Sequence, residues 1–245
     1  MKQYSCPFSE ATLAVQPAEQ PKAVVLICPG GAYQWLSPRE MWPVGNAFLA
    51  QDYGAAVLSY TVGTDLGTLP LREAGWAVGV LRQAFPYLPV YIVGFSAGGH
   101  LAASLAVHAH RMNLEKVDAA VLCYPVISAG RYAHVQSIGN LGKGPCEDFF
   151  SLERWVDKDT PPVFLWHTAS DEAVPVHNSL LFAQALLDAG AVCALHIYPH
   201  GVHGLSLATK EVEEPEKMRY ADEHVASWFS QCLLWLASLK LGSRK

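Results

Sequence analysis

The stretch from Val90 to Val107 constrains the fold of this chain most. Residues 90–93 are a short β-branched run that suits a buried parallel strand, and residues 101–107 are rich in Ala and Leu and favour a buried helix. Between them stands Gly94-Phe95-Ser96-Ala97-Gly98-Gly99, a turn made mostly of small residues. Such a turn presents the Ser96 hydroxyl at the carboxyl edge of a sheet, before a helix N-terminus whose dipole favours negative charge. We interpret Ser96 as a nucleophile; the alternative is a Gly-rich turn in which Ser96 only caps the helix.

The composition limits the classes of function that remain. The chain has 245 residues, a length that suits one α/β domain over residues 1–245. Hydrophobic residues make up 51% and charged residues 16%, and the net charge is −5. Because the sequence offers no basic stripe, we expect no nucleic-acid partner.

The N-terminus and the cysteines predict a cytoplasmic location. The first eight residues lack the apolar run of a signal peptide, and no segment approaches the ~18–20 apolar residues of a membrane span, so we expect no membrane partner. The six cysteines are scattered and form no C-x-x-C pair, so we expect them to be reduced and structural. They are Cys6, Cys28, Cys123, Cys146, Cys193 and Cys232.

Alternating strand and helix patterns predict an α/β fold with a mostly parallel, doubly wound sheet and helices on both faces. Strands are expected at residues 11–15 (an edge strand), 23–28, 55–60, 90–93, 119–124, 162–167 and 192–198, and helices at 38–51, 71–85, 101–107, 175–189 and 220–239. Sheets of this kind place their sites beyond the carboxyl ends of the strands.

Residues 128–160 interrupt this alternation. They carry four glycines and Pro145, with one short helical candidate at 151–156. A loop this long in a compact domain is usually functional. We expect this stretch, called the cap segment below, to be a short insertion that lies over the strand ends.

Three loops at predicted strand ends supply partners for Ser96. Pro29-Gly30-Gly31-Ala32 has nearly bare backbone, so the amides of Gly31 and Ala32, with that of Ala97, are candidate oxyanion donors; the alternative is an ordinary glycine turn. Tyr33 and Trp35 follow and are candidate pocket walls, or else packing aromatics.

The acid and the base are expected in the other two loops. Asp171 stands between a strand and a helix and is a candidate acid, although a helix-capping carboxylate is common there. His203 follows the last strand between glycines and is the candidate base, with His200 as a competitor. The order Ser96, Asp171, His203 is that of the α/β-hydrolase triad. The histidines show no metal-ligand spacing, so we expect neither metal nor cofactor.

With these motifs assembled, the chain resembles α/β-hydrolase esterases of the acetyl-esterase and carbohydrate (acetylxylan) esterase type, near the lipase/esterase group. Two departures are Pro29 where the lipase group has His, and Ala32 where it has a third Gly; the large N-terminal cap of the hormone-sensitive-lipase group is also absent. The matching stretches are 29–33, 94–102, 124–127, 161–164, 171–175 and 203–204.

The resemblance implies a serine esterase acting on short-acyl esters, acetyl above all, with an acetylated sugar among the candidate substrates. Ser96, His203 and Asp171 would form the triad, and an acyl-enzyme would be the intermediate. Three alternatives remain: a peptidase or a thioesterase on the same fold, and a non-catalytic binding protein of the same fold.

Overall fold

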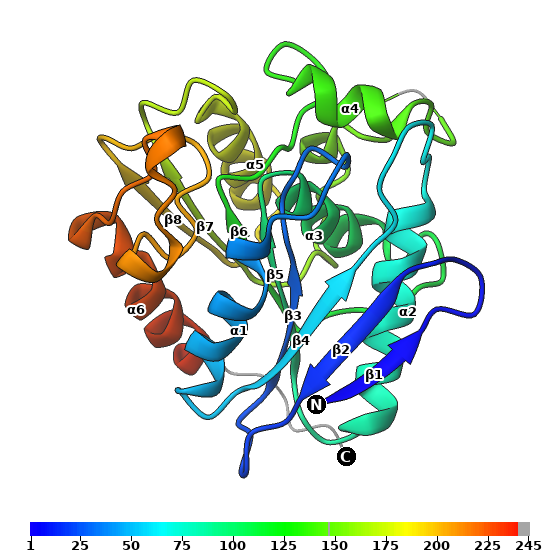
Figure 1. The fold of residues 1–245 in the computed structure, drawn as a ribbon. Coiled ribbons are helices and arrows are strands. Elements are labelled where there is room, and N and C mark those ends of the chain that lie inside the picture. Colours follow the sequence, from blue (N-terminus) through cyan, green and yellow to red (C-terminus); the bar gives the residue numbers. More distant parts are fainter. Residues whose placement is uncertain (147, 240–245) are drawn as a thin grey trace.

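The computed structural model describes residues 1–146 and 148–239. Their strands form one eight-stranded sheet in the order β1-β2-β4-β3-β5-β6-β7-β8 (Figure 1). The first two strands pair antiparallel, and β2 pairs antiparallel with β4, whereas all other neighbours are parallel. The strands are β1 (Lys2–Ser5), β2 (Thr12–Gln16), β3 (Val24–Cys28), β4 (Gly54–Ser59), β5 (Val90–Phe95), β6 (Ala119–Cys123), β7 (Val163–Thr168) and β8 (Cys193–Tyr198).

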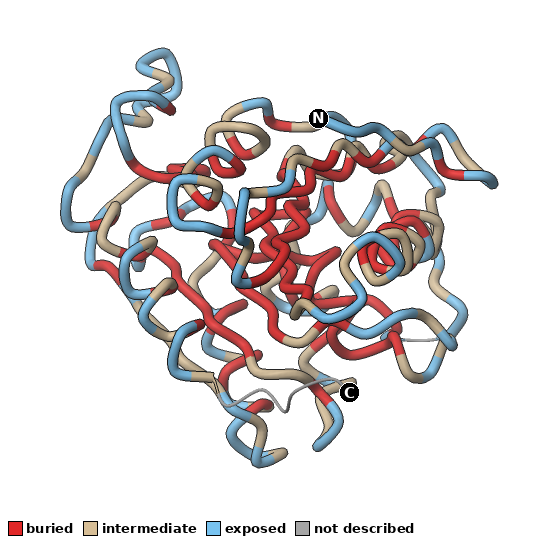
Figure 2. The backbone as a smooth tube through the Cα atoms, turned by 90° about the horizontal axis from the view of Figure 1, so that it is seen from below, coloured by how far each residue is buried: buried red, intermediate tan, exposed pale blue. Residues whose placement is uncertain are grey.

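Helices cover both faces of this sheet, as the alternating pattern predicts. One apolar core joins α2, α3 and α5 to one face, and a second joins α1 and α6 to the other (Figure 1). Successive residues of β3 enter the two cores alternately, which explains why the central strands read as continuous apolar runs. The buried backbone accordingly lies in the middle of the molecule (Figure 2). The helices are α1 (Trp42–Leu49), α2 (Leu69–Ala84), α3 (Ala97–His108), α4 (Val135–Leu141), α5 (His177–Asp188) and α6 (Glu223–Ser238).

The structure corrects three expectations about these elements. The strand at 12–16 is not the edge, because β1 pairs outside it. The helix expected over 38–51 is broken at Met41 (φ −99°, ψ −108°) into the 3-10 turn η1 (Pro38–Glu40) and α1. The cap segment contains α4, where no helix is expected, and only the 3-10 turn η2 (Leu152–Arg154) where one is.

The cap segment is fixed to α3 by two buried histidines. His100 Nε2 donates to the carbonyl of Phe150 (3.1 Å) and His108 Nε2 to that of Phe149 (3.0 Å). The His108 ring also stacks on Phe149 at 4.1 Å between centroids. Helix α4 then lies beyond the carboxyl ends of the central strands (Figure 1).

The six cysteines are all free thiols and differ in exposure. Cys6, Cys28, Cys123 and Cys232 are buried, Cys193 is half-buried and Cys146, in the cap segment, is exposed. Burial raises the pKa of the Cys193 thiol to about 11. Within 1–146 and 148–239, no helix combines the length and the apolar character that crossing a membrane requires.

Candidate active site

Ser96 stands at the sharp turn between β5 and α3. Its φ of 54° and ψ of −116° are strained for a residue with a side chain. Gly94 and Gly98 permit this turn: a Cβ atom on Gly94 would lie 2.1 Å from the carbonyl oxygen of Gly98, and one on Gly98 would lie 2.1 Å from that of Cys28. The Ser96 side chain makes no capping hydrogen bond to α3, so the alternative of a simple helix cap does not apply.

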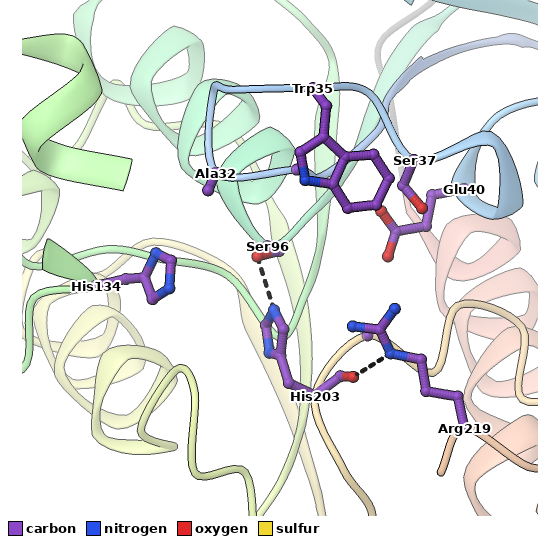
Figure 3. A pocket seen from close by; sticks show the side chains of 10 residues that line it. Ala32, Trp35, Ser37, Glu40, Ser96, His134, His203 and Arg219 are labelled. Carbon is purple, nitrogen blue, oxygen red and sulfur yellow. Dashed lines mark hydrogen bonds between the residues drawn. The ribbon is translucent and has the colours of Figure 1, made fainter. Parts of the chain in front are cut away.

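The hydroxyl of Ser96 instead meets the predicted base. His203 Nε2 lies 2.8 Å from Ser96 Oγ (Figure 3), and His203 Nδ1 lies 2.6 Å from Asp171 Oδ2. The edge of the His203 ring also packs against Tyr124, with 5.1 Å between centroids. The structure thus brings the three predicted side chains into one chain of hydrogen bonds. His200, the competing histidine, is exposed and makes no hydrogen bond to any described residue.

Asp171 is held as a carboxylate by its neighbours. Its Oδ1 accepts the N–H groups of Ala173 (3.0 Å) and Val174 (2.9 Å), and its Oδ2 also faces His167 Nε2 at 3.3 Å. Burial alone would raise the pKa of Asp171, but hydrogen bonds from His167 and His203 and the charge of His203 hold it well below its ordinary value. The carboxylate therefore both caps the turn before α5 and orients the imidazole.

The loop after β3 carries the predicted oxyanion donors. Gly31, Ala32 and Tyr33 all have positive φ, at 130°, 56° and 60°. Position 31 requires glycine, because a Cβ atom there would lie 2.0 Å from the carbonyl oxygen of Trp35. The backbone amides of Gly31, Ala32 and Ala97 donate to no acceptor within the described residues. Gly31 and Ala32 line the same cavity as Ser96, and Ala97 follows Ser96 directly.

A buried carboxylate that we did not predict fixes this loop. Glu40, 3% exposed, accepts the backbone N–H of Gly30 on Oε2 (2.8 Å) and the hydroxyl of Tyr124 on Oε1 (2.6 Å). Tyr124 in turn accepts the backbone N–H of Ser206 (2.8 Å). The network therefore ties the loop after β3 to the end of β6 and to the loop that carries His203.

Tyr33 and Trp35 have different surroundings, and the expectation for Tyr33 is wrong. Its side chain is buried at 1% exposure, its hydroxyl bonds to His100 Nδ1 (2.9 Å), and it does not line the cavity. The left-handed backbone at Tyr33 directs the ring into the core, so it packs there. Trp35 does line the cavity and is 43% exposed.

The cavity in front of Ser96 has a volume of about 120 Å³. In Figure 3, Ala32 and His134 lie on one side of Ser96, and Trp35, Ser37, Glu40 and Arg219 on the other. Arg219 Nε donates to the carbonyl of His203 (2.8 Å) and its guanidinium pairs with Glu214. The lining residues that sequence reasoning missed are Ser37, Glu40, His134, Gly204 and Arg219.

Only one of these missed residues had a usable signal. Glu40 follows the glycine loop closely and is the sole carboxylate between residues 29 and 51, whereas His134 and Arg219 stand in segments without periodicity. Among the residues that the structure describes, no group of three His, Cys, Asp or Glu side chains is arranged to hold a metal ion.

Comparison with known proteins places this geometry in a family. The chain is 38% identical over 209 residues to endo-1,4-beta-xylanase B of Butyrivibrio fibrisolvens, covering 76% of this chain and 33% of that protein. It is 30% identical over 199 residues to an acetylxylan esterase of Xylanibacter ruminicola, covering 74% of this chain and 40% of the relative. The chain thus spans between a third and two fifths of the length of these two relatives.

A solved structure extends the likeness to nearly the whole chain. The acetyl ester-xyloside bifunctional hydrolase of Caldicellulosiruptor lactoaceticus superposes with a TM-score of 0.79 at 33% identity, over 95% of this chain and 89% of that one. An alpha/beta hydrolase enzyme from a Medee basin deep-sea metagenome library superposes with a TM-score of 0.78 at 30% identity, over 94% of this chain and 93% of that one. The fold is the α/β-hydrolase fold, with the strand order given above. The sequence profile of the Dienelactone hydrolase family matches residues 83–233, more than half of the chain. This protein belongs to the Dienelactone hydrolase family.

Proposed function

We propose that this protein is a serine esterase that hydrolyses short-acyl carboxylic esters, acetyl esters above all, through an acyl-enzyme. The observation that carries the proposal is the contact chain from Ser96 through His203 to Asp171, placed beside backbone amides that have no acceptor within the described residues. A nucleophile, an oriented base and donors for an oxyanion are what acyl transfer requires.

In the proposed reaction His203 Nε2 takes the proton of Ser96 while Oγ attacks the ester carbonyl carbon. The amides of Gly31, Ala32 and Ala97 hold the resulting oxyanion. His203 then gives its proton to the alcohol oxygen, the carbon–oxygen bond breaks, and the acyl group stays on Ser96. A water deprotonated by His203 attacks this acyl group, and the carboxylic acid leaves as Ser96 regains its proton.

The preference for a short acyl group rests on the cavity. Its volume of about 120 Å³ must hold part of the alcohol as well as the acyl group, so only a short acyl group fits. Arg219 lines it beside Trp35, and an alkyl chain packed there would take this charged group out of water. A methylene adds about 0.8 kcal/mol of binding free energy only while there is space, and overpacking costs about 1–3 kcal/mol.

The alcohol part of the substrate is proposed to be a sugar. The relatives named above include an acetylxylan esterase and an acetyl ester-xyloside hydrolase, which supports acetylated sugars as substrates of this chain. A peptidase usually needs a pocket for a chain terminus, and a binding protein has no use for a strained serine turn such as that at Ser96.

An acyl series tests the proposal. We expect kcat/KM for 4-nitrophenyl acetate, butyrate and octanoate to be highest for the acetate and to fall steeply at octanoate. Matched peptide and thioester substrates, run in parallel, should be turned over far more slowly. Efficiency that rises steadily to octanoate would contradict the short-acyl assignment, and binding of esters without turnover would favour the binding protein.

A further inference from the structure

Among the residues of the cap segment that the structure describes, only His134 lines the cavity. It stands immediately before α4, half-buried, and its ring points towards the space in front of Ser96 and His203 (Figure 3). The reaction described above assigns it no part. The question is which group of a bound substrate the ring of His134 can contact.

The contacts of His134 fix which nitrogen carries its proton. The backbone N–H of Ser137 donates to Nδ1 (3.3 Å), so Nδ1 is an acceptor, and the Ser137 hydroxyl lies 2.8 Å from the same atom. In the neutral ring the proton is then on Nε2. Burial and the nearby His203 lower the pKa of His134, with Asp171 acting in the opposite direction, so the neutral ring prevails near pH 7.

Nε2 of His134 is thus an N–H donor that finds no hydrogen-bond acceptor within the described residues. Two other polar side chains along the cavity differ in this respect, whereas the Ser37 hydroxyl also has no hydrogen-bond partner within the described residues but lies on the opposite side of Ser96 (Figure 3). Both oxygens of Glu40 accept protein hydrogen bonds, and Arg219 is bonded to His203 and Glu214. Cavity-facing donors without a protein partner are the groups with which a site recognises a polar ligand.

The chemistry of an acetyl ester limits what this donor can meet. The carbonyl oxygen is directed to the amides of Gly31, Ala32 and Ala97, the ester oxygen must receive its proton from His203, and the methyl group has no acceptor. Any further oxygen belongs to the alcohol. We infer that His134 Nε2–H donates a hydrogen bond to a hydroxyl or ring oxygen of the alcohol part of the substrate, and so selects polyhydroxylated alcohols such as sugars; this rests on the proposed esterase function.

Two variants separate this role from that of a helix cap. In His134→Asn the side-chain oxygen can still accept the Ser137 N–H, but the side chain no longer reaches the cavity. In His134→Gln the amide nitrogen can occupy the place of Nε2 while the cap is lost. The substrates are an acetylated methyl xyloside and cyclohexyl acetate, which share an acetyl group and a six-membered ring and differ in hydroxyl groups.

The inference predicts that His134→Asn lowers kcat/KM for the acetylated xyloside about tenfold, mainly through KM, and changes that for cyclohexyl acetate less than twofold. His134→Gln should retain most of the activity on the xyloside. An equal loss on both substrates would assign His134 to the architecture of the site or to the oxyanion, and no loss on either would remove it from recognition; both results overturn the inference. If the wild-type protein hydrolyses no ester, including 4-nitrophenyl acetate, the esterase proposal fails first and takes this inference with it.

Discussion

The candidate site is built from two regions that are held in different ways. The loops at the strand ends carry Ser96, Asp171 and His203, and each is fixed by short connections to a buried parallel sheet. The cap segment, residues 128–160, is attached by side-chain hydrogen bonds. Two of its backbone carbonyls accept from His100 and His108 of α3, and α4 contacts the loop after β3.

The proposed catalytic side chains and the proposed substrate-recognition side chain lie in different regions. Every polar side chain to which we assign a catalytic role lies in the loops at the strand ends, called the sheet side below, where packing leaves little freedom of movement. The cap segment contributes His134 to the cavity and Asn140 to the loop after β3. We therefore expect changes on the sheet side to abolish turnover, and changes in the cap segment to alter rates modestly or to alter selectivity.

The largest effect is expected from Ser96→Ala. Removing the hydroxyl removes the nucleophile, so kcat for 4-nitrophenyl acetate should fall about 10⁴-fold or more. The thermal unfolding midpoint should stay within a few degrees of that of the wild type, because the turn is fixed by Gly94 and Gly98 rather than by the side chain. Turnover near the wild-type rate in the purified variant would refute the assignment of Ser96.

His203→Ala should be nearly as damaging, with kcat lowered about 10³- to 10⁴-fold, because the base and proton donor is lost. His200→Ala is the matched control: it lies three residues away on the same loop and is exposed. Its kcat should change less than twofold in the same ester assay. Reversed results would mean that the base has been misassigned.

Acid should lower the free energy of unfolding through the two histidines that hold the cap segment. Burial lowers the pKa of both His100 and His108 to about 4, against about 6.5 in an unfolded chain. Between these values the unfolded chain binds protons that the folded chain does not, so the free energy of unfolding falls as the pH drops from 6.5 towards 4. We expect a loss on the order of 1–3 kcal/mol per histidine between pH 7 and pH 4.5, measured by urea unfolding at each pH.

His108→Gln gives this prediction a matched variant. Gln can keep the hydrogen bond to the Phe149 carbonyl without titrating, and nothing is lost at Nδ1, which has no partner among the described residues. The difference in stability between the two pH values should shrink by about 1–3 kcal/mol. An unchanged difference would show that His108 does not carry the acid sensitivity.

The smallest effect is expected where the two regions meet. Asn140 Nδ2 donates to the carbonyl of Ala32 (2.8 Å), next to the proposed oxyanion donors. Asn140→Ala removes one hydrogen bond worth about 0.5–1.5 kcal/mol, so kcat for 4-nitrophenyl acetate should fall roughly three- to tenfold. Gln136→Ala, on the same helix and bonded to the exposed Gln34 side chain, should change kcat less than twofold. Equal effects of the two variants would mean that α4 does not position the loop.

The sheet side of this comparison was predictable from sequence because local pattern determines it. Apolar runs locate the strands. Ser96 follows β5 directly, and Asp171 and His203 stand three and five residues beyond the ends of β7 and β8, beside glycines or a helix start. The candidate triad could therefore be named from these loops, with the choice of His203 over His200 resting on the resemblance to esterases.

The structures of the cap segment and of the segment after β3 were harder to predict, because long-range contacts determine them. Helix α4 has only seven residues, and the spacing of Val135, Ile138 and Leu141 is too short a pattern, with Gly139 inside it, to distinguish a helix from a loop. The direction of Tyr33 depends on its left-handed backbone. The position of Glu40 depends on the break at Met41, which Pro43 in the first turn of α1 marks and which the expectation of one helix over 38–51 overlooked. His134 reaches the cavity only through the path of the chain between β6 and α4.

The distribution of thiols has a practical consequence for studying the cap segment. Cys146 is exposed there, whereas four of the other five cysteines are buried and Cys193 is half-buried with a raised pKa. A thiolate is the species that reacts with maleimides and related dyes, so an exposed cysteine reacts first. The native chain therefore carries its own attachment point for a fluorophore or spin label in the cap segment, and the response of this region to pH or to a bound ester can be followed spectroscopically without engineering a cysteine.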